Sequence, residues 1–192
     1  MNSVLTLSGF GVELKTVTID KIEKIRLWRN HQDIVSNMID KSNISCEQQV
    51  LWFNGLSKKK THLYLVISYK GEDIGVIYAS SETKGSNKEF HSLLNATVVS
   101  PGLYIAPECR YKNSILAFSP SLVFIDYLFI KGQCQQLVAL VYEKNNSAIR
   151  YNEMLGYQKE SIDSEGLVTM TLSYEAFQSA KNKLSKILRF NK

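Results

Sequence analysis

The chain has 192 residues, of which 44% are hydrophobic and 21% are charged, with a net charge of +5. These values fit one globular domain over residues 1–192, able to bury roughly 70% of its unfolded surface. The positive excess lies at Lys58–Lys60 and in the last dozen residues. Because no basic stripe interleaved with aromatic residues occurs, the charge favours solvated lysines over a nucleic-acid partner.

The three cysteines, Cys46, Cys109 and Cys134, are scattered and show no CxxC spacing. This pattern argues against a disulfide framework and against a metal site, and it favours a reducing compartment, so we expect a cytoplasmic protein. Membrane insertion is not expected, since no apolar run reaches the roughly 18 residues of a spanning helix.

In the first third of the chain, residues 12–17 alternate as a strand. A helix opens at Asp20 with an apolar face, and a second short helical piece runs to Met38. Ser45 and Gln48 have the spacing of a capping box, which predicts another helix start. Residues 63–68 and 74–80 form a hairpin about residues 70–73. Residues 81–95 are polar and aperiodic, which predicts a surface loop.

A β-α-β unit follows. It consists of a strand at 96–106, a basic turn at 110–113, an apolar helix ending near Gly132 and a strand at 137–142. Ser119 before Pro120 is a good N-cap, so the helix is expected to begin at about residue 119. Residues 145–157 begin a further helix.

The C-terminal region predicts a hairpin of strands at 158–162 and 167–172. It ends in an amphipathic helix at about 174–190. Packing of this helix on the domain, or pairing with a second copy in a homodimer, is favoured over membrane binding.

The turn after the 96–106 strand suits a phosphate. A strand ends there, Arg110 and Lys112 supply cations, and a helix start supplies unpaired N–H groups. Ala106-Pro107-Glu108-Cys109-Arg110 resembles the end of the fourth strand of the GNAT superfamily of N-acetyltransferases, where an Arg/Gln-x-x-Gly-x-Gly/Ala turn wraps the pyrophosphate of acetyl-CoA. Asn145-x-x-Ala148-Ile149, closing in Leu155-Gly156-Tyr157, resembles that superfamily's next signature.

The resemblance implies an α/β (α+β) fold with a mixed, mostly antiparallel central sheet, a splayed strand pair and helices on both faces. It implies acetyl-CoA as acyl donor, held by Leu103, Tyr104, Ile105, Ala106, Arg110, Lys112, Asn113, Ser114, Ile115, Asn145 and Ala148. The chain departs from the pattern because the two glycine positions hold Asn113 and Ile115, or Ile115 and Ala117 in the other register. A differently shaped or longer turn is therefore expected.

The stretch Trp28-Arg29-Asn30-His31, followed by Gln49-Val50-Leu51-Trp52-Phe53, resembles one branch of the superfamily. Members of that branch acetylate the 4-amino group of nucleotide-linked amino sugars, as in the pseudaminic acid pathway. Arg29, Asn30, His31 and Trp52 are then the candidate acceptor residues, with Arg29 as a bidentate partner for a diphosphate. The helical spacing of Trp28 and Trp52 fits core positions equally well, so that alternative stays open.

The resemblance also implies how the reaction proceeds. In the superfamily the middle of the 96–106 strand splays from its neighbour and its backbone pairs with the pantetheine arm, and here Pro101-Gly102 weakens regular pairing. The superfamily's catalytic Tyr falls on Asn152, which holds no transferable proton but can orient a water or the sulfur. We expect either no dedicated acid or a role for Tyr104 or Tyr151.

Three functions remain. The favoured one is transfer of an acetyl group to the amine of a nucleotide-linked amino sugar for surface polysaccharide or glycan synthesis. The second is acetylation of a protein N-terminus or lysine, which requires an acidic cleft. The third, suggested by the missing glycines and Tyr, is a degenerate module that binds acyl-CoA without turnover.

Overall fold

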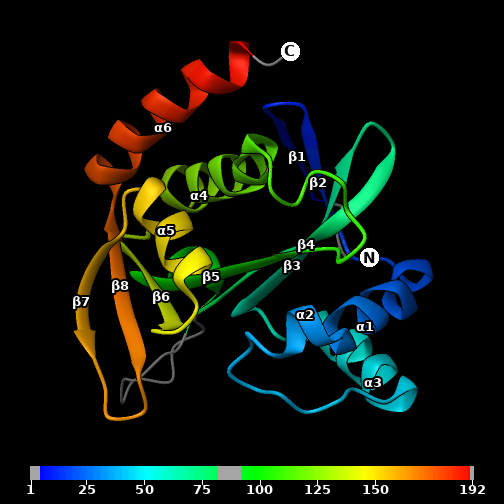
Figure 1. The fold of residues 1–192 in the computed structure, drawn as a ribbon. Helices are drawn as coiled ribbons and strands as arrows, with labels where there is room; N and C mark the ends of the chain where they lie inside the picture. The colour runs from blue at the N-terminus through cyan, green and yellow to red at the C-terminus, as the bar shows by residue number, and fades with distance from the viewer. Residues whose placement is uncertain (1–4, 82–91, 191–192) are drawn as a thin grey trace.

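A computed structural model describes residues 5–81 and 92–190 of the chain. Eight strands form a sheet in the order β1-β2-β3-β4-β5-β6-β8-β7, and every neighbouring pair is antiparallel except β5 and β6. Helices cover both faces, with α1 to α3 on one and α4 on the other (Figure 1). The predicted fold class is confirmed, while most of the predicted loop at 81–95 lies outside the described residues.

The strands are β1 (Thr6–Gly9), β2 (Val12–Thr16), β3 (His62–Tyr69), β4 (Glu72–Ser80), β5 (Val98–Ile105), β6 (Gln136–Tyr142), β7 (Gln158–Ile162) and β8 (Leu167–Ser173). The α-helices are α1 (Ile22–Asn30), α2 (Gln32–Val35), α3 (Cys46–Leu56), α4 (Ser119–Lys131), α5 (Asn146–Met154) and α6 (Tyr174–Phe190). Short 3₁₀ turns precede α1, β5 and α4: η1 (Ile19–Lys21), η2 (Leu93–Asn95) and η3 (Ile115–Phe118).

Strand side chains alternate between the two faces of the sheet and so build two separate cores. On the α4 face, Leu65, Ile67 and Ile77 are at most 1% exposed and pack with Leu122 and Phe124 of α4. On the other face a smaller core joins Val66 and Val76 to α1, through residues such as Ile22, Ile25 and Trp28. The sheet is therefore sandwiched between helices that come from different parts of the chain.

The α1 to α3 layer is fixed by polar contacts. The predicted capping box at the start of α3 is present, since Ser45 Oγ accepts from the Gln48 N–H and Gln48 Oε1 accepts from the Ser45 N–H. Buried Gln49 donates from Nε2 to the Ile22 carbonyl at 3.1 Å, which ties α3 to α1. These contacts hold a compact helical unit over the sheet.

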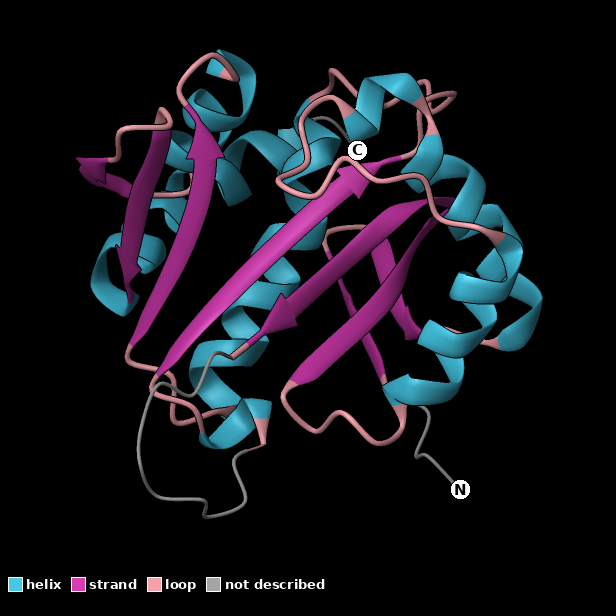
Figure 2. Cartoon of the chain, turned by 90° about the horizontal axis from the view of Figure 1, so that it is seen from below, coloured by secondary structure: helices cyan, strands magenta, loops and turns pink. Residues whose placement is uncertain are grey.

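The parallel contact between β5 and β6 is short. It covers only Val98 opposite Gln136 and Val99 opposite Leu137, after which the strands separate (Figure 2). The expectation that regular pairing weakens near Pro101-Gly102 did not specify which neighbouring strand is affected. Pairing of β5 with β4 is unbroken through these two residues, and it is the pairing with β6 that ends just before them.

The helix after this opening begins at Ser119, as predicted, but Ser119 is not its N-cap. Phe118 occupies that position because η3 winds directly into α4, and Phe118 packs into the larger core. Asn145 caps α5 by accepting from the Ala148 N–H at 3.2 Å. The N-terminal ends of α4 and α5 therefore both lie beside the opening between β5 and β6.

The C-terminal amphipathic helix is α6. Phe177, Leu184 and Leu188 are buried in the larger core, and Lys181 Nζ lies 2.6 Å from Asp126 Oδ1 of α4. The prediction that the helix packs on the domain agrees with these contacts. Within residues 5–81 and 92–190, no helix combines the length and apolar character needed to cross a membrane.

Candidate active site

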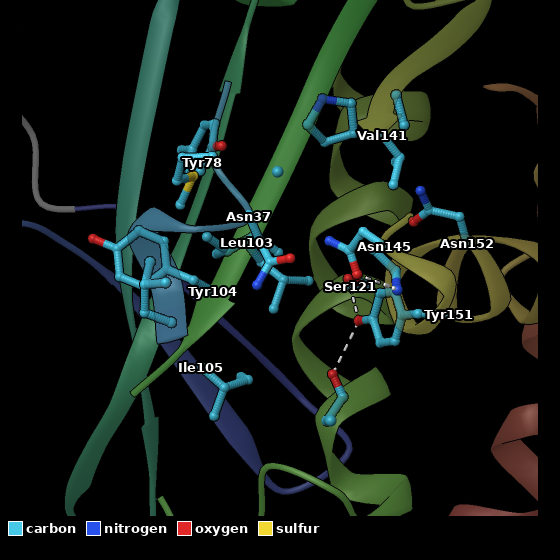
Figure 3. A pocket seen from close by; sticks show the side chains of 18 of the residues that line it. Asn37, Tyr78, Leu103, Tyr104, Ile105, Ser121, Val141, Asn145, Tyr151 and Asn152 are labelled. Carbon is cyan, nitrogen blue, oxygen red and sulfur yellow. Dashed lines mark hydrogen bonds between the residues drawn. The ribbon is translucent and has the colours of Figure 1, made fainter. Parts of the chain in front are cut away.

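A cleft of about 1160 Å³ lies where β5 and β6 diverge. One wall, named here the α1–α3 half, includes Arg29, several residues between 33 and 44, Trp52, Tyr64, Tyr78 and Tyr104. The other, the α4–α5 half, includes Leu103, Ile105, residues 112–115, Ala117, Phe118, Ser121 and cleft residues between 139 and 157. Figure 3 shows Tyr78 and Tyr104 on one side of the cleft, with Tyr151 and Asn152 on the other.

Strand β5 belongs to both halves. Leu103 and Ile105 pack with the larger core on the α4 face, whereas Tyr104 between them packs with the smaller core. Beyond Val99, no strand among the described residues pairs with the edge of β5 that faces β6. The β5 backbone therefore runs along the boundary between the two halves, with its hydrogen-bonding groups open to a ligand.

In the α1–α3 half, Arg29 stands in the last turn of α1. Its Nη2 donates to the Asp40 carbonyl, and its Nη1 is buried without a partner among the described residues. A buried guanidinium nitrogen left unpaired is costly, so this position suits an acceptor oxygen of a ligand.

An aromatic row runs beside Arg29. Trp52 meets Tyr64 edge-on at 5.1 Å between ring centroids, and Tyr64 stacks on Tyr78 at 5.3 Å. Burial raises the pKa of Tyr64, Tyr78 and Tyr104, while the charge of Arg29 acts in the opposite sense on each of them. Arg29 and the three tyrosines line the same cleft.

Trp52 was predicted either to contact the acceptor or to occupy a core position. Its ring packs against the smaller core and also lines the cleft, so the two alternatives are compatible. Tyr64 and Tyr78 were not singled out in the sequence. The sequence could have indicated them, because each strand of the predicted hairpin carries a tyrosine and the two tyrosines, Tyr64 and Tyr78, are cross-strand partners.

Asn30 and His31 do not line the cleft. Asn30 accepts from the Ile44 N–H at 2.9 Å and donates to the Ile44 carbonyl at 2.8 Å, and His31 Nδ1 accepts from the Asp33 N–H. Trp28 is also buried, and its Nε1 donates to Glu108 at 2.7 Å. These contacts shape the wall around Arg29, and direct contact of Asn30 and His31 with a substrate stays a prediction.

In the α4–α5 half, Lys112, Asn113, Ser114 and Ile115 all line the cleft. Ala106 and Arg110, which were assigned to the same site, do not. Ala106 is buried in the smaller core, and Arg110 lies toward Glu72 at 3.9 Å in a separate small pocket with a side chain 70% exposed. Within the structure, Lys112 is thus the cation of this turn that reaches the cleft.

The turn does not use the backbone conformation that glycine provides. Among the described non-glycine residues, positive φ occurs only at Phe10 and Lys70. Residues 110–115 therefore trace the turn with ordinary φ values, which explains how Asn113 and Ile115 are accommodated there. A β-turn-like bend and η3 replace the glycine-rich loop.

Cations and carboxylates face one another across the cleft. Lys112 Nζ lies 3.3 Å from Asp33 Oδ2 of α2, so this ion pair joins the two halves. Arg150 of α5 also lines the cleft, and sequence analysis did not identify it. Among the described cleft residues the cations are Arg29, Lys112 and Arg150 and the carboxylates are Asp33 and Asp40.

The candidate proton donors differ sharply. Tyr151 donates to the Ala117 carbonyl at 3.0 Å, lies 2.8 Å from Ser121 Oγ and stacks on Phe118, so its hydroxyl is engaged within the protein (Figure 3). Burial raises the pKa of both Tyr151 and Tyr104. Asn152 contacts Met170 Sδ through Nδ2 at 3.7 Å.

No protein-family model matches the sequence, and no curated protein matches it. Solved structures do match. An uncharacterized protein from Bacillus halodurans has a TM-score of 0.76 and 15% identity, over 96% of this chain and 97% of that chain. FdhC, a nucleotide-linked sugar GNAT, has a TM-score of 0.75 and 18% identity, over 96% of this chain and 98% of that chain.

The aminoglycoside acetyltransferase AAC(6′)-Ib, solved in complex with acetyl-CoA, has a TM-score of 0.70 and 16% identity. The match covers 88% of this chain and 96% of that chain. At these identities the likeness establishes the fold. The chain has the fold of GNAT acetyltransferases, with the opening between β5 and β6 at its centre.

Proposed function

We propose that this protein is an acetyl-CoA-dependent N-acetyltransferase that acts on the amine of a nucleotide-linked amino sugar for surface polysaccharide or glycan synthesis. The observation that carries the proposal is the end of β5–β6 pairing at Val99, which leaves an open strand edge along a large cleft. Structures of this fold with acetyl-CoA bound support the same reading. The free cysteines favour a cytoplasmic setting.

The donor fits the α4–α5 half. The open edge of β5 at Leu103 and Ile105 can pair with the amide groups of an extended pantetheine chain, as one strand pairs with another. Lys112 and the amides of Asn113 and Ile115 then meet the pyrophosphate where the chain enters η3. Asn145 and Ala148 line the cleft near the same chain, where α5 begins.

The reaction joins a neutral amine to the thioester carbon. The carbonyl oxygen gains charge and is stabilised by an N–H on β5; the C–S bond then breaks and the thiolate takes a proton. Tyr104, which lines the cleft, is the better placed donor, because the Tyr151 hydroxyl already donates to the Ala117 carbonyl.

The amine must lose its proton before attack. Asp33 is paired with Lys112, and the hydrogen bond from the Ser42 N–H lowers the pKa of Asp40, which makes that carboxylate a weak base. We therefore assign the base to water in the cleft rather than to either carboxylate.

The α1–α3 half fits an anionic acceptor with flat faces. Arg29 offers an unpaired buried nitrogen, and the row from Trp52 to Tyr78 offers apolar surfaces for a sugar or a base. FdhC, named as a nucleotide-linked sugar GNAT, has the same fold. A lysine or protein N-terminus is cationic and is a poorer match, because cleft cations outnumber cleft carboxylates among the described residues.

The test is a screen of nucleotide-linked amino sugars and peptides against acetyl-CoA, with release of free thiol as the readout. Turnover with an amino-sugar nucleotide and none with peptides supports the proposal. Turnover with peptides alone assigns the protein acetylation function instead. Acetyl-CoA binding without thiol release for any acceptor identifies a non-catalytic binding module.

A further inference from the structure

Tyr78 stands directly over the β5 backbone at Gly102. A Cβ added to Gly102 would lie 2.5 Å from both Cζ and Oη of Tyr78 and 2.9 Å from its Cε2, far inside contact distance. The absence of a side chain at Gly102 is therefore what lets the Tyr78 ring lie there. The space that a side chain on β5 would fill is taken by the end of a phenol from the neighbouring strand.

The ring is held from behind. Tyr78 stacks on Tyr64 with an interplanar angle of 19°, and Tyr64 is braced edge-on by Trp52 of α3 at 86°. Regular pairing of β4 with β5 fixes the backbone, since Tyr78 is the register partner of Gly102. Swinging Tyr78 away from the cleft would disrupt the stack, so the ring forms a firm wall.

The position of the wall follows from the opening of the sheet. Pairing with β6 ends at Val99, and residues 101–105 of β5 all line the cleft. Gly102 is the second residue of this stretch and lies between Val99, where β5 still pairs with β6, and Leu103. Under the proposed function a thioester carbonyl binds to this edge, and we expect its acyl chain to extend over Gly102 toward the Tyr78 ring.

We propose that Tyr78, seated on Gly102, sets the size limit of the transferred acyl group and restricts the enzyme to acetyl. This inference rests on the proposed acyl-CoA-dependent function and adds the residue that selects the donor. An acetyl methyl group ends before the ring, whereas the further methylenes of propionyl and butyryl groups meet it. Tyr78 is thus a specificity-determining residue of the α1–α3 half that acts on the substrate of the α4–α5 half.

The experiment measures the binding of acetyl-, propionyl- and butyryl-CoA by calorimetry to the unmodified protein and to three variants. Tyr78→Ala removes the wall, and Tyr78→Phe keeps the ring. Tyr69→Ala makes the same truncation on the same hairpin outside the cleft, where Tyr69 meets Tyr111. Binding needs no knowledge of the acceptor, so the readout is independent of the acceptor assignment.

In the unmodified protein each added methylene should weaken binding by roughly 10-fold or more, as expected for a methylene that a pocket does not accept. Tyr78→Phe and Tyr69→Ala should keep this order of affinities, and Tyr78→Ala should abolish it. If Tyr78→Ala does not fold, Tyr78→Leu, which keeps more of the side-chain volume, shortens the wall in its place.

Unchanged discrimination in Tyr78→Ala or Tyr78→Leu would overturn the inference, as would equal binding of all three thioesters by the unmodified protein. Either result leaves the proposed transferase function standing. Failure of the unmodified protein to bind any of the three thioesters removes the proposed function and the inference with it.

Discussion

The two halves of the cleft are built from the chain in different ways. The α4–α5 half comes from one continuous stretch, β5 to α5, in which strand, turn, helix and strand follow in order. The α1–α3 half is assembled from α1 to α3 and from single tyrosines on β3, β4 and β5. A site made by one supersecondary unit leaves a motif in the sequence, whereas a site assembled across a sheet becomes visible only once the strands are paired.

The halves also differ in how they carry charge. Lys112 and Arg150 of the α4–α5 half are at least partly open to solvent, while Nη1 of Arg29 in the α1–α3 half is buried. Charges near solvent contribute little individually and are screened by salt, whereas a buried guanidinium nitrogen without a hydrogen-bond partner favours a ligand that supplies an acceptor oxygen. Mutations of these charges should therefore affect the affinity for acetyl-CoA and the selectivity for the acceptor to different extents.

The largest expected effect separates the two tyrosines that face each other across the cleft. Tyr104→Phe should lower kcat by about 100-fold through loss of the proton donor, measured by steady-state thiol release. Tyr151→Phe should instead lower the melting temperature and leave kcat within about 10-fold, because its hydroxyl holds Ala117. The reverse pattern would move the proton donor to the α4–α5 half.

Arg29→Ala should raise the acceptor KM by roughly 10- to 100-fold, the worth of a charge-assisted hydrogen bond, and leave the KM for acetyl-CoA almost unchanged. Arg29→Lys is the matched control, since it keeps the charge but loses the planar guanidinium. Its acceptor KM should lie between those of the unmodified protein and Arg29→Ala. A variant that no longer folds, or one with a raised KM for acetyl-CoA, would show that Arg29 is structural or belongs to the donor site.

Asn152→Ala should cost about 10-fold in kcat, the effect of losing an orienting amide rather than an acid. The contact with Met170 is weak, so the melting temperature should change little. A loss beyond about 1000-fold, far above what an orienting group supplies, would give Asn152 the central role that the superfamily assigns to Tyr at this position.

Acetyl-CoA at about 100 times its dissociation constant should stabilise the folded state by roughly 2.7 kcal/mol, which raises the melting temperature by about 5 to 10 °C. Lys112→Ala should reduce this shift, and added salt should reduce it further. Arg110→Ala is the comparison: Arg110 lies outside the cleft, so its loss should matter less. Equal losses would mean that the turn rearranges to bring Arg110 to the pyrophosphate.

The smallest effect concerns how the α1–α3 half is attached to the sheet. Asp73 of β4 lies 2.8 Å from Lys21 and 3.1 Å from Ser68 Oγ. Burial by itself raises the pKa of Asp73, but the hydrogen bonds from Lys21 and Ser68 outweigh it and hold the pKa below the ordinary 3.8. This partly exposed ion pair should contribute about 1 kcal/mol.

Because the folded-state pKa of Asp73 is lowered, its contribution is fully present above pH 3.8 and is lost as the pH falls through the lowered value. Denaturant unfolding should therefore show Asp73→Asn less stable than the unmodified protein at pH 7, with the gap closing in acid. A gap that stays constant down to pH 2 would show that packing, not charge, is responsible for the effect.

Much of the fold was predictable because its signals are local. The capping box at Ser45, the hairpins and the helix from Ser119 were all identified from short patterns. β1 was missed because its side chains are exposed or half-buried, and its hairpin turns through Phe10 with positive φ, which the residue type does not predict. The N-cap at Ser119 was wrong because η3 places Phe118 in the core.

The lining of the candidate site was predictable where its residues stand in short motifs, which include Arg29 and Trp52 as well as the turn after β5. Residues 112–115 and Asn145 follow their motif into the cleft, but Arg110, two residues before Lys112, faces Glu72 instead. The direction of a side chain in a turn depends on the backbone angles. These angles could not be predicted from the motif, because Asn113 and Ile115 stand where the motif has glycine. Arg150 and Tyr78 reach the cleft through helix and sheet geometry, which single-position patterns do not encode.

The brief contact of β5 with β6 also bears on turnover. Strands β1 to β5 and strands β6, β8 and β7 are joined within the sheet by two residue pairs, and a donor lying in the opening would fill the place of a missing strand. Under the proposed function the bound acyl-CoA completes the sheet, and the departure of CoA reopens the gap between β5 and β6. The moment of product release is accordingly the moment when the two parts of the sheet are most free to move apart.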